Sequence, residues 1–252
     1  MNHTYIAFLL TTLAGLSTLL GSILIFFNFK NKNKIIANSL SFAAGVMITI
    51  SVFDLIPESI NLLKITNNSF WTITLLFLFI VLGIVISSLI DYYLPNSTYN
   101  NDNLYKVGII SMLAIIIHNI PEGIATFIAT NNSIFLGFSL SLAIALHNIP
   151  EGISISVPIY YATGNRKKAL LYTLLSALSE PIGAILAYLF LCRFINNSIL
   201  GLLFSLIAGI MLQISFCELI PNSKKYNIST RLFFILGILT MIFNLLLNYL
   251  IT

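Results

Sequence analysis

The hexapeptide His118-Asn-Ile-Pro-Glu-Gly123 occurs twice in this chain, and its second copy is His147-Asn-Ile-Pro-Glu-Gly152. Each copy lies inside a long apolar stretch, residues 107–129 and 134–161, and neither stretch contains Lys or Arg. A helix of about 20 apolar residues is long enough to cross a bilayer. The two copies therefore predict a pair of neighbouring membrane helices, each with a histidine and a glutamate in its interior.

The composition supports a membrane protein. Of 252 residues, 58% are hydrophobic and only 8% are charged, and the mean hydropathy is +0.98. Soluble domains carry roughly 25% charged residues, so this composition excludes an ordinary water-soluble fold. The two cysteines are too few for a disulfide framework. The twelve Lys and Arg residues are scattered along an apolar chain and do not form a phosphate-binding track for nucleic acid.

Eight apolar stretches are long enough to span the membrane. The first is too long for a signal-peptide core and is not followed by a small-residue cleavage site, so we expect it to be retained. The polar breaks between the stretches are short, which predicts one all-α integral membrane domain over residues 1–252. The predicted spans are 5–29, 36–60, 71–94, 107–129, 134–161, 169–192, 199–221 and 231–251.

The basic residues predict the orientation of the chain. Only Lys64 and Arg193 fall on one side of the predicted membrane. Because Lys and Arg accumulate on the cytoplasmic side, we expect a multi-pass protein of the cell (inner) membrane with both termini on the non-cytoplasmic side. The other side holds Lys30, Lys32, Lys34, Lys106, Arg166, Lys167, Lys168, Lys224, Lys225 and Arg231.

An internal repeat relates the second span to the seventh. Residues 44–57 (AGVMITISVFDLIP) resemble residues 208–221 (AGIMLQISFCELIP) at an offset of 164. Five crossings separate the two spans, so they run in opposite directions. This pattern predicts an inverted repeat of spans 1–3 and 6–8 around the central pair 4–5, an arrangement common among transporters with a substrate site near mid-membrane.

Six of the eight acidic residues lie inside or at the end of apolar spans: Asp54, Glu58, Glu122, Glu151, Glu180 and Glu218. An ionised side chain at mid-bilayer costs about 2.5–3.5 kcal/mol on insertion scales. Spans 2, 4, 5 and 7 contain no Lys or Arg that could neutralise these groups. Protons or metal cations must therefore do so.

The spacing within each hexapeptide is typical of a metal site. His and Glu at positions i and i+4 share one face of a helix, and the adjacent Asn adds an amide oxygen. Proline removes a backbone donor and clashes with the carbonyl four residues earlier, at Ile117 or Leu146, so we expect each helix to be interrupted there. Two such helices face to face offer enough ligands for two metals. The donor types suit Zn, Fe(II), Mn or Co and disfavour Cu(I).

These motifs resemble the ZIP (Zrt-, Irt-like) metal transporter family, and within it the bacterial ZupT type. The resemblance rests on the paired hexapeptides, on Ser179-Glu-Pro-Ile-Gly183 and on the repeated segments of spans 2 and 7. It implies eight transmembrane helices with outward termini, and import of divalent metal through a binuclear centre on spans 4 and 5. It also implies a possible homodimer, and metal as the substrate with no resident cofactor. The His-rich loop of many relatives has no counterpart in residues 94–106.

The resemblance also assigns ligands. It implies that His118, Glu122, His147 and Glu151 hold one metal. It implies that Asn119, Asn148 and Glu180 hold a second metal together with the two bridging glutamates, and that Asp54 is a further ligand on the pathway.

Two other functions are compatible with buried acids. A membrane-embedded metalloenzyme needs an activated water, but the HExxH motif of intramembrane metalloproteases is absent from the sequence, so we do not expect an enzyme. A proton or alkali-cation pathway could use the same carboxylates, and the duplicated histidines argue against it.

Overall fold

A computed structural model describes residues 3–93, 102–189 and 196–251, and every regular element within these ranges is helical. The elements are α1 (His3–Gly21), η1 (Ser22–Phe26), α2 (Lys32–Ile50), η2 (Ser51–Leu55), α3 (Ile56–Lys64), α4 (Ser69–Tyr93), α5 (Asp102–Asn132), α6 (Ile134–Thr163), α7 (Arg166–Ala177), α8 (Ser179–Leu189), α9 (Asn197–Ile214), η4 (Ser215–Leu219), α10 (Ile220–Lys224) and α11 (Arg231–Ile251).

The predicted all-α membrane fold is confirmed. Seven helical segments of the described chain are long and apolar enough to cross a bilayer, and residues 231–247 of α11 form a further apolar stretch. The predicted ends of the third and sixth spans, at 94 and 192, fall outside the described residues. The seven segments are His3–Phe26, Lys32–Lys64, Ser69–Tyr93, Leu104–Asn132, Ile134–Thr163, Arg166–Leu189 and Asn197–Lys224.

Several helices begin before the apolar stretch that predicted them, because polar loop residues cap their N-termini. The Asn31 side chain accepts a hydrogen bond from the Lys34 backbone N–H at 3.0 Å, and Asn165 caps Lys168 at 3.1 Å. Asn196 accepts in the same way from the backbone N–H of Ile199 at 3.0 Å. Such caps satisfy backbone donors that the first helical turn leaves free. Asparagines that hydropathy assigns to loops therefore start helices.

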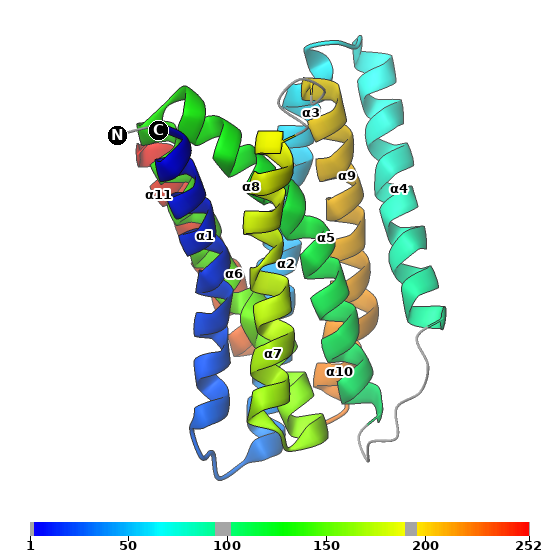
Figure 1. Ribbon diagram of the computed structural model, residues 1–252. Helices are drawn as coiled ribbons and strands as arrows, with labels where there is room; N and C mark the ends of the chain where they lie inside the picture. Colours follow the sequence, from blue (N-terminus) through cyan, green and yellow to red (C-terminus); the bar gives the residue numbers. More distant parts are fainter. Residues whose placement is uncertain (1–2, 94–101, 190–195, 252) are drawn as a thin grey trace.

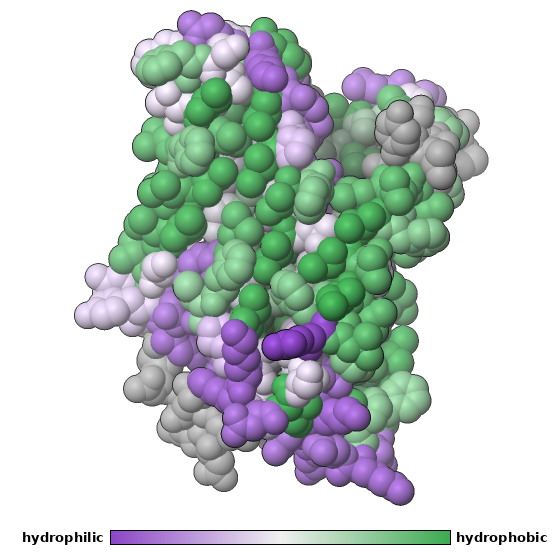
Figure 2. All heavy atoms as spheres, turned by 180° about the vertical axis from the view of Figure 1, so that it is seen from behind, coloured by the Kyte–Doolittle hydropathy of each residue, from purple (hydrophilic) through white to green (hydrophobic). Residues whose placement is uncertain are grey.

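The helices stand side by side, with the two chain termini at the same, upper end (Figure 1). The helices α5 and α6, which carry the hexapeptides, pack along each other; α1 lies against α6, and α7 and α8 lie against α5. A second set of contacts pairs α2 with α11 and α4 with α9. Hydrophilic residues gather at both ends of the molecule, mostly at the lower end, with a hydrophobic band between them (Figure 2). The hexapeptide helices thus lie among other helices.

Two close contacts between helices occupy equivalent positions in the internal repeat, whose two copies are 164 residues apart. In α2, Gly45 lies against the backbone of Phe234 in α11, and in α9 the corresponding Gly209 lies against Ile80 in α4. An added Cβ at either glycine would overlap with a carbonyl oxygen. These contacts are those expected of an inverted repeat, although the complete repeat arrangement stays a prediction.

The π-helical irregularities lie in spans 2 and 7 and not at the hexapeptides. The segments η2 and η4 are single π-helical turns at equivalent positions, and in each the first serine donates to the carbonyl of a methionine four residues earlier at 2.8 Å. Pro57 and Pro221 lie two residues after the ends of these turns.

The predicted interruption of the hexapeptide helices is wrong. Both α5 and α6 continue through Pro121 and Pro150, and α6 also continues through Pro158. A proline removes only one backbone donor, and neighbouring helices that exclude lipid make such a defect tolerable in a membrane helix.

Candidate metal site

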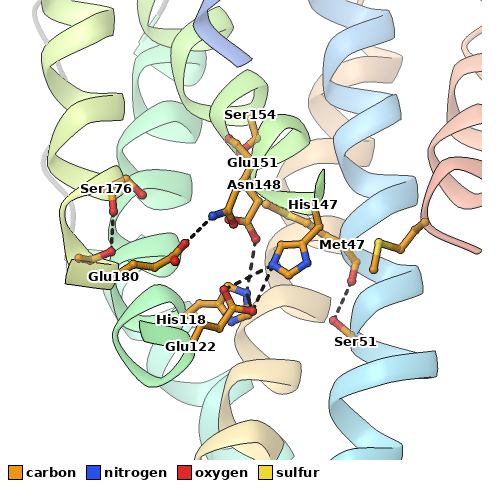
Figure 3. A network of polar contacts seen from close by, with 12 residues as sticks. Met47, Ser51, His118, Glu122, His147, Asn148, Glu151, Ser154, Ser176 and Glu180 are labelled. Carbon is orange, nitrogen blue, oxygen red and sulfur yellow. Dashed lines mark hydrogen bonds and ion pairs between the residues drawn. The ribbon is translucent and has the colours of Figure 1, made fainter. Parts of the chain in front are cut away.

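The two hexapeptides meet where α5 crosses α6, and their histidines and glutamates form one cluster (Figure 3). The Glu122 carboxylate lies between the two imidazoles: its Oε1 is 3.1 Å from His118 Nε2 and 3.2 Å from His147 Nε2. Glu151 closes the cluster from α6, with Oε1 3.5 Å from His118 Nε2. One ligand atom each of His118, His147 and Glu151 lies within 4.8 Å of the others. This spacing suits donors that surround one cation.

The cluster is almost completely buried. The exposed fractions of the side chains are 1% for His118, 3% for His147, 6% for Glu122 and 0% for Glu151. Apart from the contacts within the cluster, its polar atoms lack partners: Oε2 of Glu151 and Nδ1 of both histidines have no hydrogen-bond partner among the described residues. Buried polar groups are normally paired, and burying an unpaired charge is costly. A bound cation would satisfy these groups together.

A second set of buried polar groups adjoins the first. The Asn148 amide donates to the Ala14 carbonyl oxygen at 2.9 Å and to a carboxylate oxygen of Glu180. The amide oxygen of Asn148 and Oε2 of Glu180 have no partner among the described residues. The Asn119 side chain is also fully buried, and both its polar atoms are unpartnered within the described chain. The structure thus brings Asn148 beside Glu180, two of the residues that the family resemblance assigns to a second metal.

The glycine that ends each hexapeptide lets a neighbouring backbone approach. Gly123 lies against the backbone of Glu180 in α8, and Gly152 lies against the backbone of Thr18 in α1. An added methyl group at either position would overlap with a carbonyl oxygen. The hexapeptide therefore supplies polar side chains and also a contact surface that holds Glu180 next to Asn148.

Asp54 approaches the cluster from the other side of a cavity. A cavity of about 260 Å³ is lined by Asp54, Glu58, Glu122 and His147, among others. Asp54 is half-buried in the π-helical turn η2. Asp54 therefore shares a cavity with the cluster, and among the described residues no hydrogen bond or ion pair joins it to the histidines.

Sequence reasoning missed one polar residue of this cavity. Asn244 of α11 is 4% exposed, lines the cavity, and donates to the Ala143 carbonyl oxygen of α6 at 3.0 Å. It belongs to no motif. The signal that could have revealed it is an amide in the middle of an otherwise apolar span, because such residues rarely face lipid.

The fold and the cluster define a polytopic membrane protein with a buried, cation-compatible site between its helices. The ZIP Zinc transporter family matches residues 92–245. Among similar proteins are the "Zinc transporter ZupT" of Clostridium perfringens and that of Akkermansia muciniphila, each 42% identical over 90% of both chains. The "Zinc transporter ZupT" of Campylobacter jejuni is 40% identical over 88% of this chain and 89% of its own.

This chain belongs to the ZIP family, as its motifs predicted. Members of this family are transporters and not enzymes, which removes the metalloenzyme as an interpretation of the buried cluster.

Proposed function

We propose that this protein carries divalent transition metals, zinc first among them, across the cell membrane into the cytoplasm. The observation that carries the proposal is the buried cluster of two imidazoles and two carboxylates, which lies in stretches without Lys or Arg (107–129 and 134–161) and has unpartnered atoms. Relatives named as zinc transporters support zinc as the substrate. Imidazole and carboxylate donors are common zinc ligands.

The proposed site holds two metals. His118, His147, Glu122 and Glu151 would bind the first, since their ligand atoms face one another within a few ångströms. Asn119, Asn148 and Glu180, with the two glutamates as bridges, would bind the second. The oxygen-rich second position favours harder ions, so ferrous iron, manganese and cobalt are proposed as further substrates.

Asp54 is proposed to bind metal on its way to the cluster. The cavity that it lines with Glu122 and His147 supports this role. The distribution of Lys and Arg supports outward termini and therefore entry of metal from the end of the bundle at which the termini lie. A homodimer is also proposed, on the resemblance to the family alone.

Uptake into proteoliposomes tests the proposal. Wild-type protein should accumulate Zn²⁺, and Fe²⁺, Mn²⁺ and Co²⁺ should compete with it. Glu122→Gln and Glu151→Gln keep the shape of the side chain and remove its charge, so each should lower uptake by at least about tenfold. Asp91→Asn is the matched control, because Asp91 pairs with Lys106 at 2.8 Å at the end of α4. Normal uptake by both glutamine variants would exclude the site.

Counting bound metal tests the second position separately. Wild-type protein should bind two Zn²⁺ per chain by native mass spectrometry. Glu180→Gln should bind one, because it removes only a ligand of the second position. If Glu180→Gln still binds two ions, the proposed division of ligands is wrong even where transport is lost in the glutamate variants.

A further inference from the structure

We infer that an anionic phospholipid binds between α2, α10 and α11, in a pocket that is separate from the metal site. The pocket has a volume of about 450 Å³. It lies at the end of the bundle that carries most of the Lys and Arg residues. The residues that define this α10–α11 pocket are Ser41, Ser223, Lys224, Thr230, Arg231 and Phe234.

Two free cations line the pocket. Lys224 and Arg231 are exposed, and neither has an ion-pair or hydrogen-bond partner among the described residues. Their neighbour Lys225, by contrast, donates to Asn222 Oδ1 at 2.8 Å. Neither Lys224 nor Arg231 forms an ion pair with a carboxylate within the part of the chain that the structure describes. These two cations are therefore available to attract an anion.

The turn between α10 and α11 places both cations, Lys224 and Arg231, beside the same pocket. Asn227 has a φ of 51°, in the left-handed region, and its backbone N–H donates to the Lys224 carbonyl oxygen at 3.1 Å. The Ser41 hydroxyl of α2 donates to the Thr230 carbonyl oxygen at 3.2 Å. These bonds tie the chain before and after the turn, so the pocket is formed by the fold and not by mobile lysine tails alone.

An apolar stripe continues from the pocket along α11. Ile235 lines the pocket, and exposed apolar residues follow it at helical spacing on the same face: Leu239, Ile242 and Leu246, with exposed fractions of 54%, 37% and 56%. At 1.5 Å per residue, residues 235–246 cover about 16 Å. That length is close to one leaflet of a hydrocarbon core about 30 Å thick.

The ligand that matches both features is a phospholipid with a negative headgroup. Its phosphate would contact Lys224 and Arg231, and one acyl chain would follow the stripe on α11. Basic pockets between membrane helices at the charged membrane surface bind such headgroups. Free phosphate shares the headgroup chemistry but makes no use of the stripe.

Lipid retention by the intact protein tests this inference. Native mass spectrometry would compare phosphatidylglycerol with phosphatidylcholine of the same acyl chains. We expect a preference of at least about tenfold for phosphatidylglycerol, lost in Lys224→Gln/Arg231→Gln. The control Lys32→Gln/Lys34→Gln removes the same charge at the same end of the bundle and should keep the preference. Equal retention of both lipids, or equal loss in the control, would overturn the inference.

Thermal unfolding separates the lipid from other sources of phosphate. Long-chain phosphatidylglycerol should raise the unfolding midpoint, whereas inorganic phosphate and dihexanoyl phosphatidylglycerol should raise it much less. A full shift with inorganic phosphate would mean a free-phosphate site and would refute the lipid as ligand.

Two single variants replace the double variant if that variant does not fold. Arg231→Lys keeps the charge, and Leu239→Gln interrupts the apolar stripe. Arg231→Lys should retain the lipid, and Leu239→Gln should weaken it. The opposite pattern would contradict the inference.

Discussion

Replacing Gly123 by alanine should distort the metal site without changing any proposed ligand. The new Cβ would lie 2.7 Å from the Glu180 carbonyl carbon and 2.9 Å from its Cα, with the carbonyl oxygen closer still. Ordinary contact begins at 3.4 Å, so the carbonyl carbon must retreat by about 0.7 Å and the carbonyl oxygen by more. All three atoms belong to the backbone. No rotamer change can relieve the overlap, and α8 itself must move.

The cost follows from two opposing effects. Overpacking in a helix interface costs about 1–3 kcal/mol, and a rigid backbone neighbour favours the upper value. Alanine stabilises a helix interior by about 1 kcal/mol relative to glycine. The net destabilisation should be about 2 kcal/mol. Because α8 carries Glu180 with it, zinc affinity at the second position should also fall by about tenfold.

Chemical unfolding in detergent measures the first effect, and calorimetric zinc titration measures the second. Gly201→Ala is the matched control, because its new Cβ would meet the Leu63 side chain at 2.9 Å and its nearest backbone neighbour, the Ser59 carbonyl oxygen, only at 3.1 Å. That side chain can adjust, so the control should change stability by less than about 1 kcal/mol. If Gly123→Ala is as stable as the control and binds zinc normally, the tight α5–α8 contact does not position Glu180.

Three further outcomes are expected. Asp54→Asn should raise the KM for zinc uptake several-fold and leave the maximal rate unchanged, since it removes charge along the approach to the cluster; an unchanged KM would exclude this route. Zinc at 100 times its Kd should stabilise the wild-type protein by about 2.7 kcal/mol, an effect that a chelator reverses and that Glu151→Gln lacks. Asn244→Leu should lower the free energy of unfolding by about 1 kcal/mol, because it removes the hydrogen bond to the Ala143 carbonyl oxygen. Chemical unfolding would detect this loss, and an unchanged free energy of unfolding would mean that this bond contributes nothing.

The sequence predicted those parts of the site that a repeated local spacing encodes. His118 and Glu122 share a helix face because they are four residues apart, and the second copy repeats the geometry in the adjacent helix. Their mutual approach required only that α5 and α6 pack together, which is usual for helices joined by a short turn. The contact of Asn148 with Glu180 followed from the family resemblance and could not be derived from spacing.

The rest depended on tertiary contacts that no local pattern encodes. Asn244 joins the cavity because α11 packs beside α6, and its span contains no motif. Proline positions were misjudged for a related reason: the sequence does not say which helices are protected from lipid on all sides. Pro121 lies in a continuous helix, whereas Pro57 follows an irregular turn.

The π-helical turns at residues 51–55 and 215–219 each hold one residue more than a regular α-helical turn. Deleting one residue within either turn should therefore restore a regular α-helix and keep the segments before and after it in register. Elsewhere in these helices each residue turns the chain by about 100°, so a deletion earlier in α2 would rotate Asp54 away from the cavity wall. The two helices should therefore accept a one-residue deletion at these turns more readily than anywhere else along their length.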